Sequence, residues 1–289
     1  PNEAGGLFLQ NVHDTRIGGT EVGSRNVISG NGGDGLLLEG GNNNLIQGNY
    51  IGANALGNAA VPNEGDGVLL TQTSGVLVGG TASAARNVIS GNREDGVEFV
   101  HTGANRLQGN YIGLNAAGTA ALPNGENGVN LADSSGHLIG GTERGARNVI
   151  SGNSGHGISV IHDAGDIRIQ GNYIGTNPVG RASIPNQGHG VRVLDGSQSI
   201  QVGGTSAGAG NLISGNAGDG VHLSGETVFD PLPPPTAFNV VQGNLIGTDA
   251  GGDAAIPNQG NGVSLQDGEF AGVRENAIGG TAAGARNLI

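Results

Sequence analysis

The feature that most constrains this chain is a repeat within a repeat. The motif Asn-(Val/Leu)-Ile-Ser-Gly-Asn starts four times, and its first three residues return near the end of the chain. These starts are Asn26, Asn87, Asn148, Asn211 and Asn287, separated by 61, 61, 63 and 76 residues. Self-similarity at such a period is typical of architectures in which one structural unit stacks on the next.

Each long repeat contains two shorter units. A Gly followed by an apolar residue, any residue and another apolar residue begins nine units, at intervals of 29, 32, 29, 32, 29, 33, 30 and 42 residues. Every unit holds three short segments of alternating apolar residues bounded by Gly and Asn, and none shows a sustained helical period. The chain is therefore predicted to be all-β, a single parallel β-solenoid with three short strands per coil, about nine coils, and coils that alternate between 29 and 32 residues.

Asparagines recur at fixed places in these coils. An inward carboxamide can bond both the corner backbone and the carboxamide of the next coil, so a stacked internal ladder is expected. Its predicted members are Asn26, Asn49, Asn87, Asn110, Asn148, Asn172, Asn211, Asn244 and Asn287. A second column is expected at Asn31, Asn54, Asn92, Asn115, Asn153, Asn177, Asn216 and Asp249.

Composition excludes several classes of protein. The 289 residues include 60 Gly and no Cys, which excludes disulfides and thiolate chemistry. Twelve basic residues stand against 24 carboxylates, a formal net charge of −12, so nucleic acid is not expected as a partner. No apolar run approaches the roughly 20 residues of a membrane helix, and membrane insertion is not expected either.

Three motifs carry a resemblance to a known group. Asn-Val-Ile-Ser-Gly-Asn, Gln-Gly-Asn-Tyr-Ile-Gly and Pro-Asn-x-Gly-x-Gly-Val resemble the right-handed parallel β-helix repeats of the pectate-lyase-like superfamily, most of all the arrays in large secreted or surface proteins of bacteria. The resemblance implies a right-handed coil and a secreted or cell-surface location of bacterial type. It implies no single activity, because that superfamily includes polysaccharide lyases, hydrolases, epimerases, tailspikes and non-enzymatic adhesive arrays.

For an enzyme of this superfamily, the resemblance implies a site on the outer face of the first strand or at the corner after it. The outward column of the first strand holds one carboxylate, Glu98, so the paired carboxylates of glycoside hydrolysis are not expected there. The corner offers alternating His and Asp on four successive coils, which could relay a proton or ligate a divalent ion. The catalytic candidates are His101, Asp133, His162 and Asp195, with Arg192 on the neighbouring strand. The alternative is that these are solvated corner residues.

A second polar column stands directly before the Gly that opens each coil. It contains Asp34, Asp66, Asp95, Asn127, His156, His189, Asp219 and Asn261. Asp-Gly and Asn-Gly favour turns, and the nonapeptide period of a calcium array is missing, so this column is interpreted as turn chemistry. No metal site or cofactor is predicted, and no motif supports Ca²⁺. Arg25, Arg86, Arg147 and Arg286 precede ladder asparagines and are expected to cap the long corners.

The outward residues of the third strand form an apolar stripe that includes Tyr50, Tyr111, Tyr173 and Leu245. Such a stripe must be covered, either by the 16-residue corners of the same chain, which we favour, or by a partner or glycan stacked on the tyrosines. Residues 226–239 interrupt the repeat with a Pro-rich segment, which is expected to project from the rod.

The leading functional hypothesis is a non-enzymatic, extracellular structural or adhesive solenoid. Residues 1–289 are expected to form one continuous β-helix without caps, a segment of a longer array or the subunit of an end-to-end filament. Its expected partners are further copies of itself or an extracellular polysaccharide. The alternative is a carbohydrate-active β-helix enzyme: a polysaccharide lyase, hydrolase or epimerase.

Overall fold

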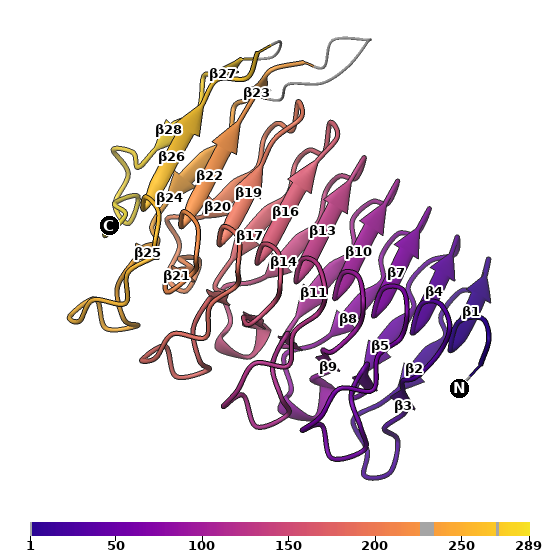
Figure 1. Cartoon of the computed structure of the whole chain (residues 1–289). Helices are drawn as coiled ribbons and strands as arrows, with labels where there is room; N and C mark the ends of the chain where they lie inside the picture. The colour runs from indigo at the N-terminus through magenta and orange to yellow at the C-terminus, as the bar shows by residue number, and fades with distance from the viewer. Residues whose placement is uncertain (1, 226–233, 270–271) are drawn as a thin grey trace.

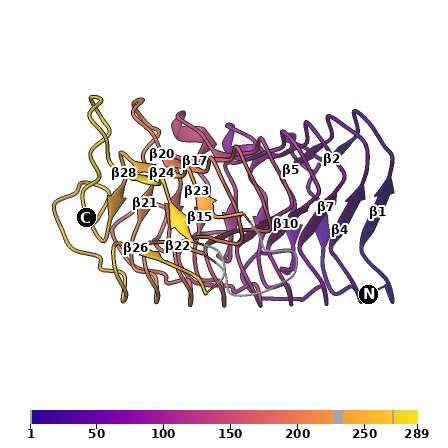
Figure 2. The same cartoon turned by 90° about the horizontal axis from the view of Figure 1, so that it is seen from above.

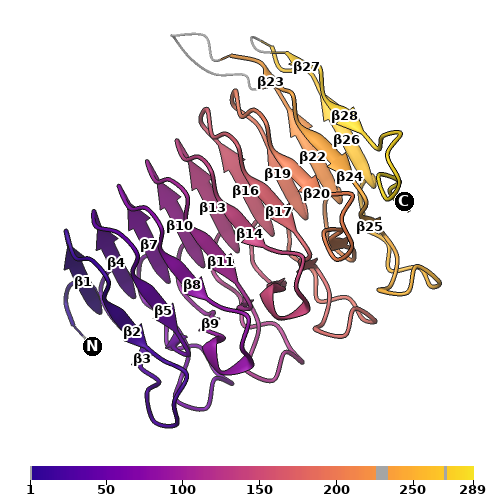
Figure 3. The same ribbon diagram turned by 180° about the vertical axis from the view of Figure 1, so that it is seen from behind.

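The computed structural model describes residues 2–225, 234–269 and 272–289. The chain winds as a rod of stacked coils from the indigo N-terminal end to the yellow C-terminal end (Figure 1), and the same order of coils is visible from above and from behind (Figures 2 and 3). Each coil contributes one strand to each of three parallel sheets, except that the last coil adds only the single bridge of Leu288 to Leu245 in the third sheet. The expected right-handed parallel β-helix is confirmed.

The first sheet has nine strands, one per coil. They are β1 (Leu7–Gln10), β4 (Leu36–Glu39), β7 (Val68–Thr71), β10 (Val97–Val100), β13 (Val129–Ala132), β16 (Ile158–Ile161), β19 (Val191–Val193), β22 (Val221–Ser224) and β26 (Val263–Gln266). The second sheet also has nine: β2 (Arg16–Gly18), β5 (Leu45–Gln47), β8 (Leu77–Gly79), β11 (Arg106–Gln108), β14 (Leu138–Gly140), β17 (Arg168–Gln170), β20 (Gln201–Gly203), β24 (Val240–Gln242) and β28 (Ala277–Ile278).

The third sheet has eight strands of two residues each. They are β3 (Val27–Ile28), β6 (Tyr50–Ile51), β9 (Val88–Ile89), β12 (Tyr111–Ile112), β15 (Val149–Ile150), β18 (Tyr173–Ile174), β21 (Leu212–Ile213) and β25 (Leu245–Ile246). A fourth, two-stranded sheet joins β23 (Thr236–Ala237) to β27 (Val273–Arg274). Two 3₁₀ turns, η1 (Ser83–Ala85) and η2 (Arg144–Ala146), lie in long corners. Among the described residues, no helix is long and apolar enough to cross a bilayer.

The strands stack in register, so that like side chains lie on like. Val97 pairs with Val129 and Phe99 with Leu131, and all four side chains are buried. The Gly that opens each coil is required by close backbone approach: a Cβ on Gly67 would lie 2.6 Å from the carbonyl oxygen of Gly96. Burial of these columns, at roughly 1.5–3 kcal/mol per side chain, forms a mainly aliphatic core in which Phe99 is also fully buried.

The predicted asparagine ladder is confirmed in all nine coils. Each carboxamide Nδ2 donates to the Oδ1 of the next asparagine at 3.0–3.2 Å. The same oxygen accepts a backbone N–H, as when Asn148 Oδ1 accepts from the backbone N–H of Asn110 at 3.0 Å. These bonds satisfy the polar groups that a tight buried corner would otherwise leave unpaired.

The second asparagine column differs from the prediction in alternate coils. Its interior members in these coils are Asn63, Asn124, Asn186 and Asn258. The first three bond to the asparagines of the coils before and after, and Asn258 accepts from Asn216 in the coil before it. The expected Asn54, Asn115, Asn177 and Asp249 instead accept backbone N–H groups four residues ahead in outward turns. The long corner folds out as a small antiparallel loop, and the inward column resumes only at the Pro-Asn pair that follows it.

The apolar stripe of the third sheet is largely covered by the chain itself. Tyr111 is 8% exposed and packs in a cluster with Val88, Leu114 and Val149. The guanidinium of Arg86 lies 4.1 Å from the centroid of the Tyr111 ring, and the pairs Arg25 with Tyr50 and Arg147 with Tyr173 repeat this contact. The same three arginines donate Nε–H to glycine carbonyls at 3.1–3.2 Å, which confirms their expected role as corner caps. Each tyrosine of the stripe thus has one ring face covered by an arginine of the same chain.

The end of the interruption at 226–239 lies within the stack of coils. Residues 226–233 lie outside the described residues. Thr236, Ala237 and Asn239 are buried, and β23 pairs with β27, so the prediction that the whole segment projects is wrong for these three residues. Asn239 Oδ1 accepts the backbone N–H of Ile200, which returns the chain to the stack.

Candidate functional site

Two outward columns run side by side along the first sheet. One is the residue before the Gly that opens each coil, and the other is the outward residue three positions later on the strand. Asp95 and Glu98, and likewise Asp219 and His222, are such pairs. Side chains from neighbouring coils therefore meet on one face of the rod.

The first of these columns is an acceptor column, in which each side chain accepts the backbone N–H of its counterpart in the next coil. The bonds are Asp34 Oδ1 from Asp66, Asp66 Oδ1 from Asp95, Asp95 Oδ1 from Asn127, Asn127 Oδ1 from His156, His156 Nδ1 from His189, His189 Nδ1 from Asp219, and Asp219 Oδ1 from Asn261, at 2.6–3.0 Å. Besides favouring a turn, the column thus provides in each of these coils a hydrogen-bond acceptor for one backbone N–H of the next coil. Asp, Asn and neutral His all supply the required acceptor.

In the N-terminal half of the column, burial shifts the acids toward the neutral form. Burial, with the charges of Glu98 and Asp95, raises the pKa of Asp66 well above its ordinary value. Burial also raises the pKa of Asp95 to about 7. The two carboxyl groups are 3% and 4% exposed, and Asp66 shares a hydrogen bond with Glu98. Glycoside hydrolysis needs carboxyl groups about 5–9 Å apart on either side of a sugar bond, and this buried cluster does not provide that arrangement.

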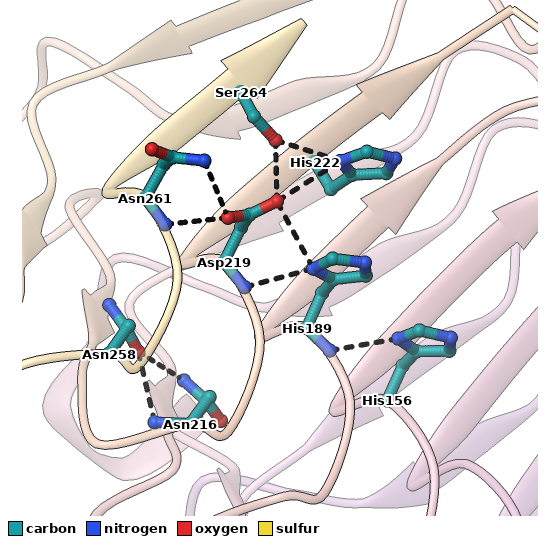
Figure 4. A network of polar contacts seen from close by, with 8 residues as sticks. All are labelled: His156, His189, Asn216, Asp219, His222, Asn258, Asn261 and Ser264. Carbon is teal, nitrogen blue, oxygen red and sulfur yellow. Dashed lines mark hydrogen bonds and ion pairs between the residues drawn. The ribbon is translucent and has the colours of Figure 1, made fainter. Parts of the chain in front are cut away.

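In the C-terminal half, three imidazole rings stack across successive coils. Ring centroids of His156 and His189 lie 5.1 Å apart, those of His189 and His222 lie 4.4 Å apart, and the planes are tilted by only 5° and 4°. Figure 4 shows the three rings side by side, with their far nitrogens pointing away from Asp219. The stack presents one row of imidazole edges on the outer face of the first sheet.

A carboxylate and a hydroxyl orient the last ring of this stack. Ser264 Oγ lies 2.6 Å from Asp219 Oδ2 and 2.7 Å from His222 Nδ1, which is itself 3.2 Å from Asp219 Oδ2 (Figure 4). Burial alone would raise the pKa of Asp219, but hydrogen bonds from Ser264 and Asn261, together with His189, lower it. The ionised carboxylate can only accept, so Ser264 donates to Asp219 and His222 Nδ1–H donates to Ser264. In the neutral ring of His222, Nε2 is then the nitrogen without a proton.

The other two rings take the opposite tautomer. His156 Nδ1 and His189 Nδ1 each accept a backbone N–H at 2.9 Å, which leaves the ring proton on Nε2. Burial, with the charges of Arg192 and the neighbouring histidines, lowers the pKa of His156 to about 3. Burial and the charge of His222 lower the pKa of His189. The row therefore offers two Nε2–H donors beside the Nε2 of His222.

These residues do not fit a bound metal ion in this arrangement. Ligand atoms of His189, Asp219 and His222 lie within 4.8 Å of one another. A metal must lie near the plane of each imidazole that binds it, and planes inclined by 4° with centroids 4.4 Å apart share no such position. The Nδ1 of His189 is also engaged by the backbone N–H of Asp219.

The four candidates of the corner after the first strand fall into two pairs. His101 Nδ1 lies 4.0 Å from Asp133 Oδ2, and His162 Nε2 lies 3.7 Å from Asp195 Oδ2. All four adopt φ between 49° and 55°, the left-handed conformation in which Asn, Asp and His are enriched among residues other than Gly. The demands of the turn thus explain their residue types, and their catalytic role stays a prediction.

Arg192, the fifth candidate, lies beside the histidine stack and not at the corner after the first strand. It stands on β19 in register with His222 on β22, and its charge acts on both His156 and His189. Sequence reasoning assigned His189 and Asp219 to turns and did not single out His222 or Ser264. A spacing in the sequence could have revealed these residues. The residue before the opening Gly and the residue three positions after it, as in Asp219 and His222, lie side by side on the outer face of the strand.

Comparisons with known proteins agree with this architecture. The family model described as "Right handed beta helix region" matches residues 2–204. Among solved structures, the chain is similar to the periplasmic alginate epimerase AlgG, with a TM-score of 0.57 and 15% identity over 88% of this chain and 49% of that one. It is also similar to the A-module of the Azotobacter vinelandii mannuronan C-5 epimerase AlgE4, with a TM-score of 0.39 and 18% identity over 98% and 58%.

The chain thus spans about half the length of AlgG. No protein of curated function matches the sequence. At this level of identity the solved structures establish the fold alone. The family match covers most of the chain and agrees with the three parallel sheets and the asparagine ladder: this protein belongs to the right-handed β-helix family.

Proposed function

We propose that this protein acts on an acidic polysaccharide laid along the outer face of the first sheet, and that His222 removes a proton from the sugar carbon next to a carboxylate. The observation that carries the proposal is the contact chain from Asp219 through Ser264 to His222. It fixes the ring and leaves Nε2 free to take a proton. This is the usual way in which a fold prepares a general base.

Arg192 supplies the complementary charge. It is adjacent in register to His222, and a guanidinium can hold a sugar carboxylate and stabilise the negative charge that develops on it when the neighbouring proton leaves. The Nε2–H groups of His156 and His189 lie in the same row and can donate to sugar oxygens. Base, cation and donors therefore occupy adjacent coils on one face.

The proton balance allows two outcomes. The C–H electron pair moves into the carboxylate as the proton passes to His222 Nε2. The resulting enolate either expels the glycosidic oxygen, which takes a proton from water and leaves as a hydroxyl, or takes a proton from water on its opposite face. In both cases His222 then returns its proton to the solvent. The first outcome is that of a lyase and the second that of an epimerase, the activity named for the AlgG structure.

Ser264 is a positioning residue in this scheme. A serine nucleophile would donate its hydroxyl proton to the histidine, and the carboxylate would contact the other ring nitrogen. Here the hydroxyl lies between the carboxylate and the ring, on the side away from the free Nε2. Covalent catalysis by Ser264 is therefore not proposed.

The structural or adhesive hypothesis is the competing proposal. The asparagine ladder and stacked aliphatic columns serve a scaffold as well as an enzyme. A scaffold, however, has no use for a histidine oriented through a serine by an ionised carboxylate. We therefore favour the enzyme, with filament formation, glycan adhesion and an extracellular location as the alternative.

Solvent exchange tests the proposal directly. The protein is incubated in D₂O with uronate polysaccharides, alginate among them, and deuterium at the carbon next to the carboxylate and unsaturated chain ends are measured by NMR and mass spectrometry. Exchange or cleavage is expected, and His222→Gln should reduce it about 10²–10⁴-fold. His101→Gln, in the pair with Asp133, is the matched control and should retain full activity.

Three results would overturn the proposal. They are no exchange or cleavage with any uronate polymer, full activity in His222→Gln, or loss of activity in His101→Gln alone. The first would favour the scaffold hypothesis, and the last would favour the corner pairs.

A further inference from the structure

A second distinctive surface lies at the corner between the second and third sheets, away from the histidine stack. A hollow of about 360 Å³ opens between the long corners that follow β8 and β14. Its lining consists of Thr81, Ala82, Ser83, Arg86, Gly109, Tyr111, Arg144, Gly145, Arg147, Val149 and Pro178. We call this hollow the arginine pocket.

The charge of the arginine pocket is opposite to that of the molecule. Three of its lining residues are arginines and none is acidic, although the chain carries 24 carboxylates and only 12 basic residues. Within the described part of the chain, no carboxylate forms an ion pair with Arg86, Arg144 or Arg147. Burial and the nearby charge of Arg144 lower the pKa of Arg147, so concentrating these cations has a cost that a bound anion would offset.

Two of the guanidinium groups are held rigidly. Arg86 and Arg147 donate Nε–H to the carbonyls of Gly109 and Gly171, and their planes lie on tyrosine rings at 4.1 and 3.8 Å. The Nη hydrogens remain for a ligand. Guanidinium groups fixed in this way suit carboxylate and sulfate, whose oxygens accept pairs of parallel hydrogen bonds.

The next repeat contains a matched hollow without this charge. It has a volume of about 350 Å³, is centred on Tyr173, and has Arg147 as its only cationic lining residue. By repeat alignment, Ala207 takes the place of Arg144 and Gly210 the place of Arg147. The shape is therefore a property of the repeat, whereas the three-arginine lining is specific to one coil pair.

We propose that the arginine pocket binds the carboxylate or sulfate group of a saccharide, at a site separate from the proposed reaction centre. The volume is that of a small-ligand site, larger than a bare ion requires. Arg86, Arg144 and Arg147 hold the anionic group. The hydroxyls of Thr81 and Ser83 and the apolar surface of Pro178 are suited to the rest of a sugar unit.

Calorimetric titration of the full chain tests this proposal with three probes: an oligouronate, a sulfated oligosaccharide and a neutral oligosaccharide of equal length. At least one of the two acidic probes should bind, and its affinity should fall as salt is added. The neutral oligosaccharide should not bind. Arg144→Gln changes an exposed side chain and should raise Kd at least tenfold. Arg93→Gln, which removes the exposed ion pair with Glu64, should leave Kd unchanged.

Binding must be assigned to the correct face. Because His222→Gln leaves the arginine pocket intact, it should retain this binding event even where it abolishes turnover, so the two proposals fail separately. The pocket proposal is overturned if neither acidic probe binds, if Arg144→Gln binds as the unchanged protein does, or if sodium sulfate alone binds as tightly as the saccharides.

Discussion

The two halves of the acceptor column have the same structural role but different chemistry. In the N-terminal half Asp34, Asp66 and Asp95 accept a backbone N–H from the next coil, and in the C-terminal half His156 and His189 do so. Burial acts on both halves in one direction, toward the neutral form. It raises the pKa of the acids and lowers that of the histidines.

Asp219 is the exception in this column. Its pKa is lowered, because Ser264 and Asn261 donate hydrogen bonds to it and His189 lies beside it. A carboxylate is thus held ionised where the neighbouring histidines are neutral, and that contrast orients His222. The comparison teaches that the fold requires only an acceptor at each position, which leaves the remaining atoms of each side chain available for chemistry.

The largest effect is expected from making the histidine half acidic. His189→Asp retains an acceptor for the Asp219 N–H but places a second carboxylate beside Asp219. Two charges about 4 Å apart repel by roughly 4 kcal/mol at an effective dielectric constant near 20, so about 2–4 kcal/mol of stability should be lost at pH 8. Thermal unfolding should show partial recovery at pH 5. His189→Asn is the uncharged control, and equal melting temperatures for the two variants at pH 8 would contradict the comparison.

An effect of opposite sign is expected in the acidic half. Because the native pKa of Asp66 is raised, the folded state retains a proton that the unfolded chain releases above about pH 4, and stability falls as the pH rises from there toward the native pKa. Asp66→Asn retains the acceptor for Asp95 and removes this penalty. Its melting temperature at pH 8 should rise by roughly 2–4 °C for each kcal/mol gained. No gain over the unchanged protein at pH 8, or an equal gain at pH 4, would reject the raised pKa.

The sequence was sufficient to predict most of the fold. Each buried side chain meets its counterpart one coil away, so a fixed spacing such as Asn87 to Asn110 determines both register and ladder. The second asparagine column was half wrong because spacing cannot show that a 16-residue corner folds outward. Only the stacked structure reveals that Asn54 turns out to solvent while Asn63 takes the inward place.

The candidate site was much less predictable. His189 and Asp219 each precede a glycine, and within a single coil this turn pattern is a sufficient explanation for both residues. Their chemistry depends on contacts between coils that are 30 to 42 residues apart in the sequence, such as Ser264 with His222. The tautomers depend in turn on which backbone N–H groups point at which ring nitrogen.

The smallest effect at neutral pH is expected from His156→Asn, which tests the acid limit of the histidine half. Asn127 performs the same hydrogen-bonding role one coil earlier, so stability at pH 7 should change by less than about 0.5 kcal/mol. The native His156 stays neutral down to about pH 3, whereas the unfolded chain gains a proton below about pH 6.5, so stability is lost as the pH falls through this window. The variant should therefore unfold at lower pH than the unchanged protein in an acid titration followed by circular dichroism. If the two proteins unfolded at the same acidic pH, His156 would not be held neutral by burial. Asp66→Asn, in the acidic half of the column, is the control, and it should not lower the pH of acid unfolding as His156→Asn does.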